Sequence, residues 1–309
     1  MAAQHTSSGR SRLGIGQKFI GGIGHPEFKG ATLWCGKLLT IMLLLGLTAC
    51  STTSFVYNRL HIVIPWFIDD YVSLTSVQDD QLEVLLKGAV QQNRQYSLPK
   101  YIAVIDQLII ALDEPLSREI IMPIYRQVVV EMTALKNQTL TWMLALGQTL
   151  SEAQIDEFVD QLQQQLKRDE EQYLSRDTAE YHRQNYQRLK DVFDNFLGSL
   201  DEQQLHTLRQ ASEQLQRADS QWLEQRKQRH TALAGILRQR ESGWEIRVLQ
   251  LLDEPAETQA DLPSQAYQFN LQLLMDASAT VINNRSERQD RYLRSKLNRL
   301  RGDLVKLNR

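Results

Sequence analysis

The sequence contains few residues that break helices. Its 309 residues include 7 prolines and 15 glycines, and many of the glycines lie before Lys37. Proline lacks an amide proton and glycine loses the most backbone entropy on folding, so both disfavour helix interiors. Their scarcity after Lys37 predicts long helices there.

Cysteine is also scarce. The two cysteines are Cys35 and Cys50, and Cys35 lies upstream of a cleavage site that we predict below. A mature chain with one cysteine can form neither an internal disulfide nor a thiolate metal site. We therefore expect no disulfide framework and no cysteine-bound metal.

Motifs of known catalytic and metal sites are missing. None of the histidines after Cys50 belongs to a His-Glu-x-x-His pair, and none follows a glutamate by three residues: His61, His182, His206 and His230. The sequence has no Gly-x-Ser-x-Gly motif and no phosphate-binding glycine loop. We therefore expect a non-enzymatic protein with no metal and no cofactor beyond covalent lipid.

One acidic pair stands near an expected pocket. Asp69 and Asp70 are adjacent in the sequence. Adjacent residues point in different directions on a helix, which favours a capping or solvent-facing role over catalysis. The alternative is an envelope enzyme whose unrecognised site joins these acids with His61, His182 and arginines.

Excess positive charge is absent as well. After the predicted cleavage, 30 of the 35 basic and 36 of the 37 acidic residues remain, so the mature chain carries a net charge of −6. Nucleic-acid binding requires clustered positive charge, so this balance argues against a nucleic-acid partner.

An apolar run near the N-terminus ends in a cysteine. Lys37 precedes the mostly apolar residues 38–47, which lead directly into Leu47-Thr48-Ala49-Cys50. Ten residues are too few to span a bilayer but suit a secretory signal. This order resembles the bacterial lipobox, in which the three residues before the cysteine fit the signal peptidase and the cysteine takes lipid. We predict a signal peptide over residues 1–49; a short buried helix ending in cysteine is the alternative.

The lipobox resemblance implies where the protein is anchored. Cys50 would carry diacylglycerol and an N-acyl chain, followed by a tether over residues 50–54, and several acyl chains together give stable anchoring. Ser51 is not the aspartate that retains such proteins at the inner membrane, so we expect the periplasmic face of the outer membrane. Residues 1–32 favour a start codon assigned too early, and a disordered extension is the alternative.

Apolar residues after the tether recur every three or four positions, the period of an amphipathic helix. We predict helices over residues 82–90, 102–112 (with Ser97 as cap), 113–147, 202–237 and 267–281, and one helix or two over residues 151–197. Glu254 to Pro263 form the clearest loop. No stretch alternates with a period of two, so the predicted fold is an all-α multi-helix bundle with a helical domain over residues 55–284.

Three sites share the order leucine, capping residue, two spacers and glutamine. In such a capping box the Ser, Thr or Asp oxygen accepts from the amide three residues on, and the glutamine side chain reaches back to the cap's own N–H. We therefore predict helix starts at Leu74-Thr75-Ser76-Val77-Gln78, Leu150-Ser151-Glu152-Ala153-Gln154 and Leu200-Asp201-Glu202-Gln203-Gln204.

Residues 55–72 are rich in aromatic side chains and are interrupted by Pro65. We expect short helical turns that pack on the core. An interfacial wedge that dips into lipid is the alternative, because tryptophan and tyrosine suit the depth of lipid headgroups.

The last 25 residues are basic. Residues 285–309 hold nine arginines and lysines against three acids, so we predict a basic C-terminal helix. Arg285, Arg288 and Arg291 recur every three residues and should share one helical face with Arg294 nearby. Such a helix pairs with the acidic body of the protein or contacts anionic lipid or an acidic partner.

Two resemblances follow from these residues. The first is carried by Tyr57-Asn58-Arg59-Leu60, by residues 64–72 and by Leu74-Thr75-Ser76-Val77-Gln78, just after the lipobox. Together they resemble a gammaproteobacterial lipoprotein family without known function, which implies coverage of nearly all of the mature chain and no assigned activity. The boxes also resemble, in part, those of Spy- and CpxP-type periplasmic helical chaperones, although the second and third carry Ser151 and Asp201.

The sequence therefore favours a non-enzymatic, outer-membrane-anchored helical lipoprotein. Its partners would be the membrane, through the anchor, and a protein or other envelope component. A chaperone or stress-related adaptor and an envelope enzyme are the alternatives.

Overall fold

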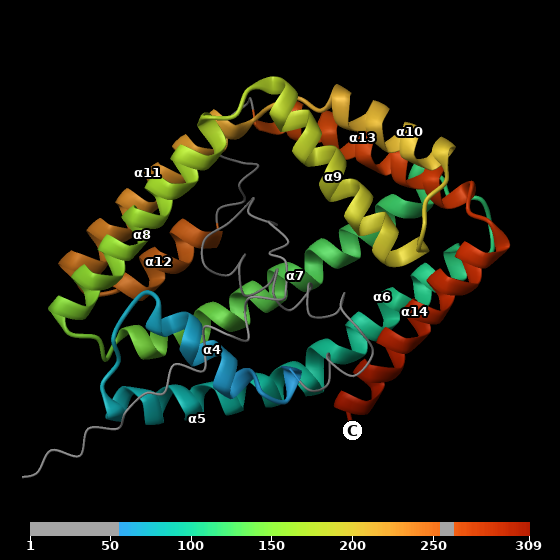
Figure 1. Ribbon diagram of the computed structural model, residues 1–309. Helices are drawn as coiled ribbons and strands as arrows, with labels where there is room; N and C mark the ends of the chain where they lie inside the picture. Colours follow the sequence, from blue (N-terminus) through green and yellow to red (C-terminus); the bar gives the residue numbers. More distant parts are fainter. Residues whose placement is uncertain (1–55, 254–262) are drawn as a thin grey trace, which may run out of the picture.

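The computed structural model describes residues 56–253 and 263–309, and helices account for nearly all of them, with no strand in this part of the chain (Figure 1). The helices are α4 (Leu60–Asp69), α5 (Ser76–Gln92), the π-helical turn η1 (Asn93–Ser97), α6 (Leu98–Ala111), α7 (Arg118–Gly147), α8 (Glu152–Leu174), α9 (Thr178–Leu197), α10 (Glu202–Gln214), α11 (Asp219–Gln239), α12 (Trp244–Asp253), α13 (Pro263–Asn283) and α14 (Glu287–Leu307). This confirms the predicted all-α fold of long helices, of which α7 has 30 residues.

The predicted capping boxes all start helices. Thr75, Ser151 and Asp201 each accept a hydrogen bond from the amide of the glutamine three residues later, and each glutamine side chain accepts from the cap's amide. A fourth box, Ser286 with Gln289, starts α14 in the same way. This box does not fit the sequence pattern of the other three, because Arg285 stands where they have leucine.

The glutamines of these boxes bind one another in pairs. Gln78 and Gln154 exchange side-chain amide hydrogen bonds of 3.1 and 2.7 Å. Gln204 and Gln289 do the same at 3.2 and 2.8 Å. Each pair joins two helix starts that lie far apart in the sequence, so the caps also fix tertiary structure.

The first half of the chain, α4 to α8, and the second half, α9 to α14, repeat one arrangement. In the first half α4 precedes and packs on α5, which also contacts α7; in the second, α9 precedes and packs on α10, which contacts α13. The helices that start at the second box of each half, α8 and α14, contact the opposite half. There α8 packs on α11, and α14 packs on α6. Contacts to Ser73 and Ser199 also correspond, because their carbonyls accept from Gln154 and Gln289 respectively.

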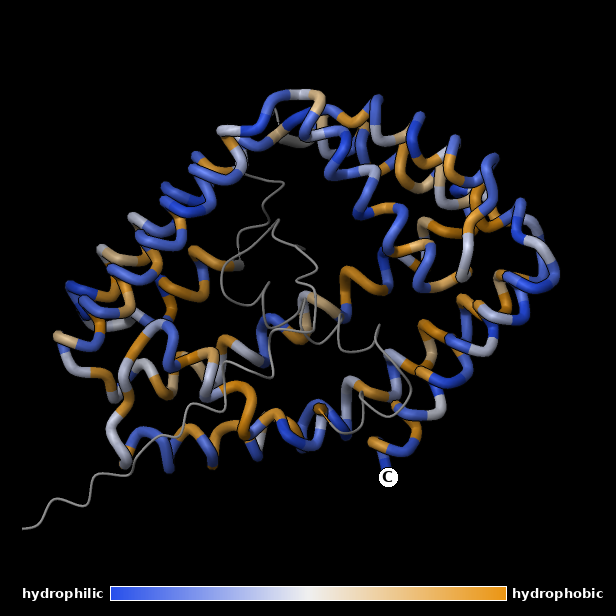
Figure 2. Tube along the Cα trace, in the orientation of Figure 1, coloured by the Kyte–Doolittle hydropathy of each residue, from blue (hydrophilic) through white to orange (hydrophobic). Residues whose placement is uncertain are grey.

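The helices follow a closed frame that α7 crosses (Figure 1). The pairs α8–α11 and α6–α14 lie on opposite sides of it, and each helix carries interspersed hydrophobic and hydrophilic positions (Figure 2). Buried apolar residues form separate clusters along the frame. Leu82 and Leu208, each one turn after a paired glutamine, are fully buried in the two largest clusters.

The structure separates helices that the sequence left joined. Residues 151–197 form two helices, and the single helix expected over residues 202–237 is wrong, because the chain leaves the helix at Leu215. Asn270 of α13 compensates the break: its side chain accepts from the Gln216 amide and donates to the Gln216 carbonyl, both at 2.8 Å.

Two expected helix starts are also wrong. Ser97 makes no capping hydrogen bond, because it closes the π-helical turn instead of preceding a free helix end. The next helix begins at Arg118 and not at Asp113. Asn283 binds both backbone groups of Leu116 at 2.7 and 2.8 Å, which holds the preceding segment outside the helix. The predicted loop from Glu254 lies almost entirely outside the described residues.

Candidate functional site

A large cavity lies between the two halves of the molecule. Its volume is about 490 Å³, within the range of about 300–1,000 Å³ typical of small-molecule sites. Residues of α6, α7, α9, α13 and α14 line it, and nearly all of them are aliphatic or aromatic. An apolar ligand could therefore be accommodated without unpaired polar groups along most of the wall.

The polar lining residues of this cavity include a linked group. The Tyr57 hydroxyl donates to the side-chain oxygen of Asn93 at 2.9 Å, and the Asn93 amide donates to the Tyr101 hydroxyl at 3.4 Å. Burial raises the pKa of Tyr57 to about 12 and also raises the pKa of Tyr101. Both hydroxyls are therefore neutral hydrogen-bonding groups at physiological pH.

The π-helical turn positions this group. Pro99 has no amide proton and cannot donate to the carbonyl of residue 95, so the normal helical pattern fails there. The chain widens instead, and the Leu98 amide donates to the Asn93 carbonyl five residues back. Isolated π-turns are frequent at functional sites. This turn buries Asn93, which lines the cavity, and Ser97.

Glu131 of α7 also lines the cavity, and it is the one charged side chain among the lining residues. It is 4% exposed, which is rare for a carboxylate. The Gln127 side chain donates to one of its oxygens at 2.7 Å, and Lys100 lies 3.6 Å from the other. The sequence did not single out Glu131, because the polar and apolar residues around it in the helix give no local sign that its side chain is buried.

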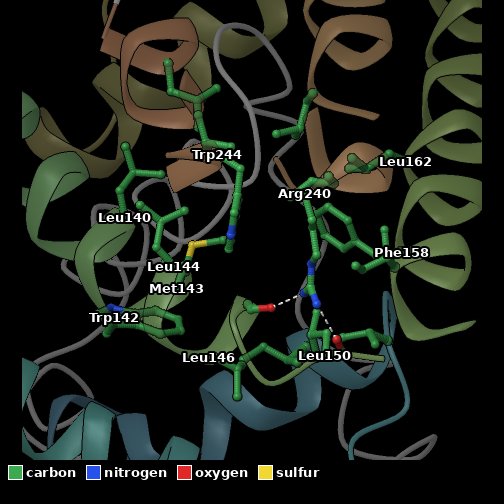
Figure 3. Close-up of a pocket in the computed structure, with 18 residues that line it drawn as sticks. Leu140, Trp142, Met143, Leu144, Leu146, Leu150, Phe158, Leu162, Arg240 and Trp244 are labelled. Carbon is green, nitrogen blue, oxygen red and sulfur yellow. Dashed lines mark hydrogen bonds between the residues drawn. The ribbon is translucent and has the colours of Figure 1, made fainter. Parts of the chain in front are cut away.

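A second, smaller cavity also takes its wall from helices of both halves (Figure 3). Its volume is about 110 Å³, and α4, α7, α8, α11 and α12 line it. Phe158 and Leu162 of its wall lie four and eight residues after Gln154. In the large cavity, Leu293 and Leu297 lie at the same distances after Gln289. The repeated fold thus builds two related apolar chambers of different size.

Arg240 closes one side of the small cavity. Its guanidinium donates to the carbonyls of Gly147 and Leu150, at the end of α7 and just beyond it (Figure 3). A cation at the carbonyl end of a helix is favourable because that end carries partial negative charge. Arg240 itself ends α11 with a φ of +43°, a left-handed conformation that non-glycine residues rarely adopt. These bonds hold it there.

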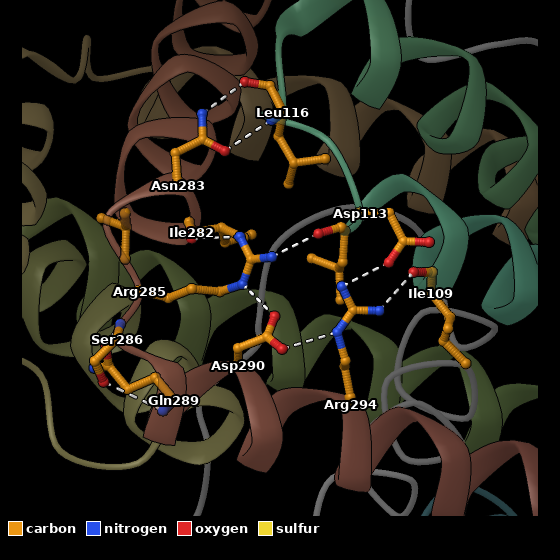
Figure 4. Close-up of polar contacts among 12 residues, drawn as sticks. Ile109, Asp113, Leu116, Ile282, Asn283, Arg285, Ser286, Gln289, Asp290 and Arg294 are labelled. Carbon is orange, nitrogen blue, oxygen red and sulfur yellow. Dashed lines mark hydrogen bonds and ion pairs between the residues drawn. The ribbon is translucent and has the colours of Figure 1, made fainter.

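The arginines predicted for lipid or partner contact divide into two kinds. Arg285 and Arg294 bind the protein itself: both donate to Asp290, and they also donate to the Leu112 and Ile109 carbonyls at the end of α6 (Figure 4). Arg294 also pairs with Asp113 at 2.9 Å, so two carboxylates and the end of α6 oppose the two cations.

Arg288 and Arg291 are exposed, and Arg291 pairs with Glu287 at 3.5 Å. The expectation that Arg285 shares one helical face with them is wrong, because Arg285 lies in the turn before α14. The basic helix packs on α6 and α9 of the acidic body. This is the pairing that the sequence analysis weighed against lipid contact.

The residues considered for an enzymatic site do not converge. His61, Asp69 and Asp70 are exposed on and beside α4, and His182 of α9 binds the Leu215 carbonyl at 3.2 Å. None of the four lines either cavity described above. The described part of the chain holds no cluster of three metal-ligating side chains.

The lipobox residues Leu47, Thr48, Ala49 and Cys50, together with Ser51, lie outside the described residues. Among the described helices, none combines the length and apolar character needed to cross a membrane.

The fold and the cavities define an all-α protein with two related halves and an apolar internal chamber. Residues 70–268 match the family of unknown function DUF6279, and since the match covers more than half of the chain, the protein belongs to this family. The predicted membership of a family without assigned function is confirmed, although the match is shorter than the expected coverage. No curated protein and no solved structure matches the chain.

Proposed function

We propose that this protein is a lipid-anchored, non-enzymatic binding protein that holds an amphiphile, a molecule with an apolar chain and a polar head, in the large cavity. The observation that carries the proposal is the cavity of about 490 Å³ with an apolar wall and a few polar groups. A small number of convergent polar groups in an apolar pocket is the usual form of a small-molecule site.

The polar groups of the cavity are suited to binding rather than to reaction. The hydroxyl of Tyr57 is engaged by Asn93, and burial raises the pKa values of Tyr57 and Tyr101, so both stay protonated at physiological pH and supply no phenolate as base or nucleophile. No histidine, serine–histidine pair or cysteine lies among the lining residues. Recognition of a head group requires none of these.

The sequence supports a membrane-bound location for this activity. The lipobox predicts lipid on Cys50, and Ser51 favours the periplasmic face of the outer membrane. Five residues lie between Cys50 and Val56, so the chain spans at most about 20 Å between them when extended. On α4, Ile62 and Trp66 are 40% and 65% exposed, one helical turn apart, as an interfacial contact close to such an anchor would require. The envelope is also where amphiphiles are abundant.

The chaperone alternative loses part of its support. The boxes that carry the resemblance start helices and join one another through their glutamines. Helix capping and tertiary pairing therefore account for them without a client-binding role.

Co-purification tests the proposal. The full chain would be purified from envelopes, and the bound small molecules would be extracted and identified by mass spectrometry. A Val128→Phe substitution fills part of the cavity wall, whereas Val130→Phe adds the same volume to the same helix at a position that is 57% exposed. We expect an amphiphile to co-purify with the wild type and with Val130→Phe and to be lost from Val128→Phe. Equal recovery from all three, or recovery from none, would contradict the proposal.

A further inference from the structure

We propose that Glu131 recognises the head group of the bound amphiphile, and that this head group is a cationic amine at the end of an apolar chain. The inference rests on the binding function proposed above and names the ligand class for the same cavity. It begins with the burial of Glu131, whose side chain is 5% exposed on a wall that is otherwise uncharged. A buried carboxylate is favourable only when cations or donors satisfy it.

The carboxylate of Glu131 is only partly satisfied. Its Oε1 accepts a hydrogen bond from Gln127 Nε2 at 2.7 Å. Its Oε2 is buried and accepts no hydrogen bond, and Lys100 Nζ lies 3.6 Å from it. Oε2 therefore has an unused acceptor position, but the atom is enclosed, so a donor from the cavity reaches it by taking the place of Lys100.

Lys100 does not block such a donor. Its side chain is 55% exposed, so its ammonium group can return to water when another cation takes its place. The exchange keeps the buried carboxylate paired and leaves no charge without a partner. A ligand amine can donate to Oε2 at hydrogen-bond distance, which Lys100 does not.

Anionic and neutral head groups fit less well. A carboxylate or phosphate would face the negative charge of Glu131, and like charges at close range repel strongly in an apolar environment. The hydroxyl of Tyr57 and the amide of Asn93 are already bonded to each other. A neutral alcohol can donate one hydrogen bond to Oε2 but does not balance its charge.

Calorimetric titration of the full chain in phosphatidylcholine nanodiscs tests the inference, with heats from empty nanodiscs subtracted. The probes are decylamine, 1-decanol and decanoate. We expect decylamine to bind at least tenfold more tightly than 1-decanol, and decanoate to bind most weakly. Glu131→Gln should remove the preference for the amine, while Glu119→Gln, an exposed glutamate of the same helix, should retain it.

The comparison among the three probes on the wild type does not depend on whether a variant folds. Equal affinities, or tighter binding of decanoate than of decylamine, would overturn the amine assignment and leave the binding function intact. If no probe binds the wild type more tightly than it binds Val128→Phe, the binding function itself fails.

Discussion

Gln78 and Gln154 lie in the first turns of α5 and α8, 76 residues apart in sequence, and each donates from its side-chain amide to the other's side-chain carbonyl oxygen. Each glutamine also accepts the amide of its own capping residue. One side chain thus completes a local cap and a tertiary contact together. Gln204 and Gln289 repeat the arrangement in a more buried place, where Gln204 is fully inaccessible to solvent.

The buried glutamine pair should be strongly coupled. Gln204→Leu or Gln289→Leu removes both hydrogen bonds of the buried pair and leaves the partner amide with its bond to the Ser199 or Val281 carbonyl, which we expect to lower the free energy of unfolding by about 1–3 kcal/mol. The double variant should cost clearly less than the sum of the two, since each single variant already removes both hydrogen bonds between the glutamines. Urea denaturation measures all three, with the exposed Gln203→Leu as a control that should change stability by less than about 0.5 kcal/mol. Additive costs would contradict the coupling.

Asp290 should be more important to stability than the exposed arginines near it. Burial acts to raise its pKa, but hydrogen bonds and charge from Arg285 and Arg294 outweigh this and lower it. Asp290→Asn should therefore reduce the free energy of unfolding by about 1–3 kcal/mol at neutral pH. Because the pKa is lowered on folding, this contribution is present at neutral pH and is lost as the pH falls through the folded value.

The matched control for Asp290→Asn is Arg288→Ala, which removes an exposed charge from the same helix. It should alter stability by no more than about 0.5 kcal/mol. Similar effects of the two variants in urea denaturation would show that the Arg285–Asp290–Arg294 group is not structurally important.

His230 should make the fold sensitive to mild acid. Burial, followed by the charges of Arg226 and Arg229, lowers its pKa from 6.5 to about 4. The unfolded chain therefore binds a proton between these values that the folded protein does not, so stability falls as the pH drops from about 6.5 to 4, by about 3 kcal/mol.

Replacing His230 should remove this dependence. We expect His230→Leu to flatten the difference in unfolding free energy between pH 7 and pH 4.5, as measured by urea denaturation at about these two values. His206→Leu, which removes an exposed histidine, should keep the wild-type slope. An unchanged slope in His230→Leu would mean that folding does not lower the pKa of this histidine.

The predicted anchor can be tested in the cell. Cys50→Ser should abolish incorporation of labelled palmitate and prevent cleavage before residue 50, because serine offers no thiol for diacylglycerol transfer. Ser51→Asp should retain lipid but move the protein to inner-membrane fractions, whereas Ser54→Asp should not. Continued lipid labelling of Cys50→Ser would contradict the lipobox, and an unchanged location of Ser51→Asp would contradict only the sorting prediction.

Local signals explain where the sequence analysis was correct. Thr75, Ser151 and Asp201 were recognised as helix starts because a cap and its glutamine interact within three residues. Leu215 and Leu116 were wrongly placed inside helices, because α10 ends before Leu215 and α7 begins after Leu116. The backbone at these two places is bound by Asn270 and Asn283, which are distant in sequence. The Ser286 box followed the same local rule and could have been found by dropping the requirement for a preceding leucine.

The sequence by itself determined that the described chain is all-α, where several helices start, and which residues resemble a lipobox. These properties depend on hydrogen bonds and apolar spacing within one or two helical turns. Only the tertiary structure decided that the glutamines of distant boxes pair, that Arg285 is held by Asp290, and that Glu131 is buried on a cavity wall. Burial and pairing of these groups depend on which helices meet, and α9, α13 and α14 line the same cavity as α7 although they are distant from it in sequence.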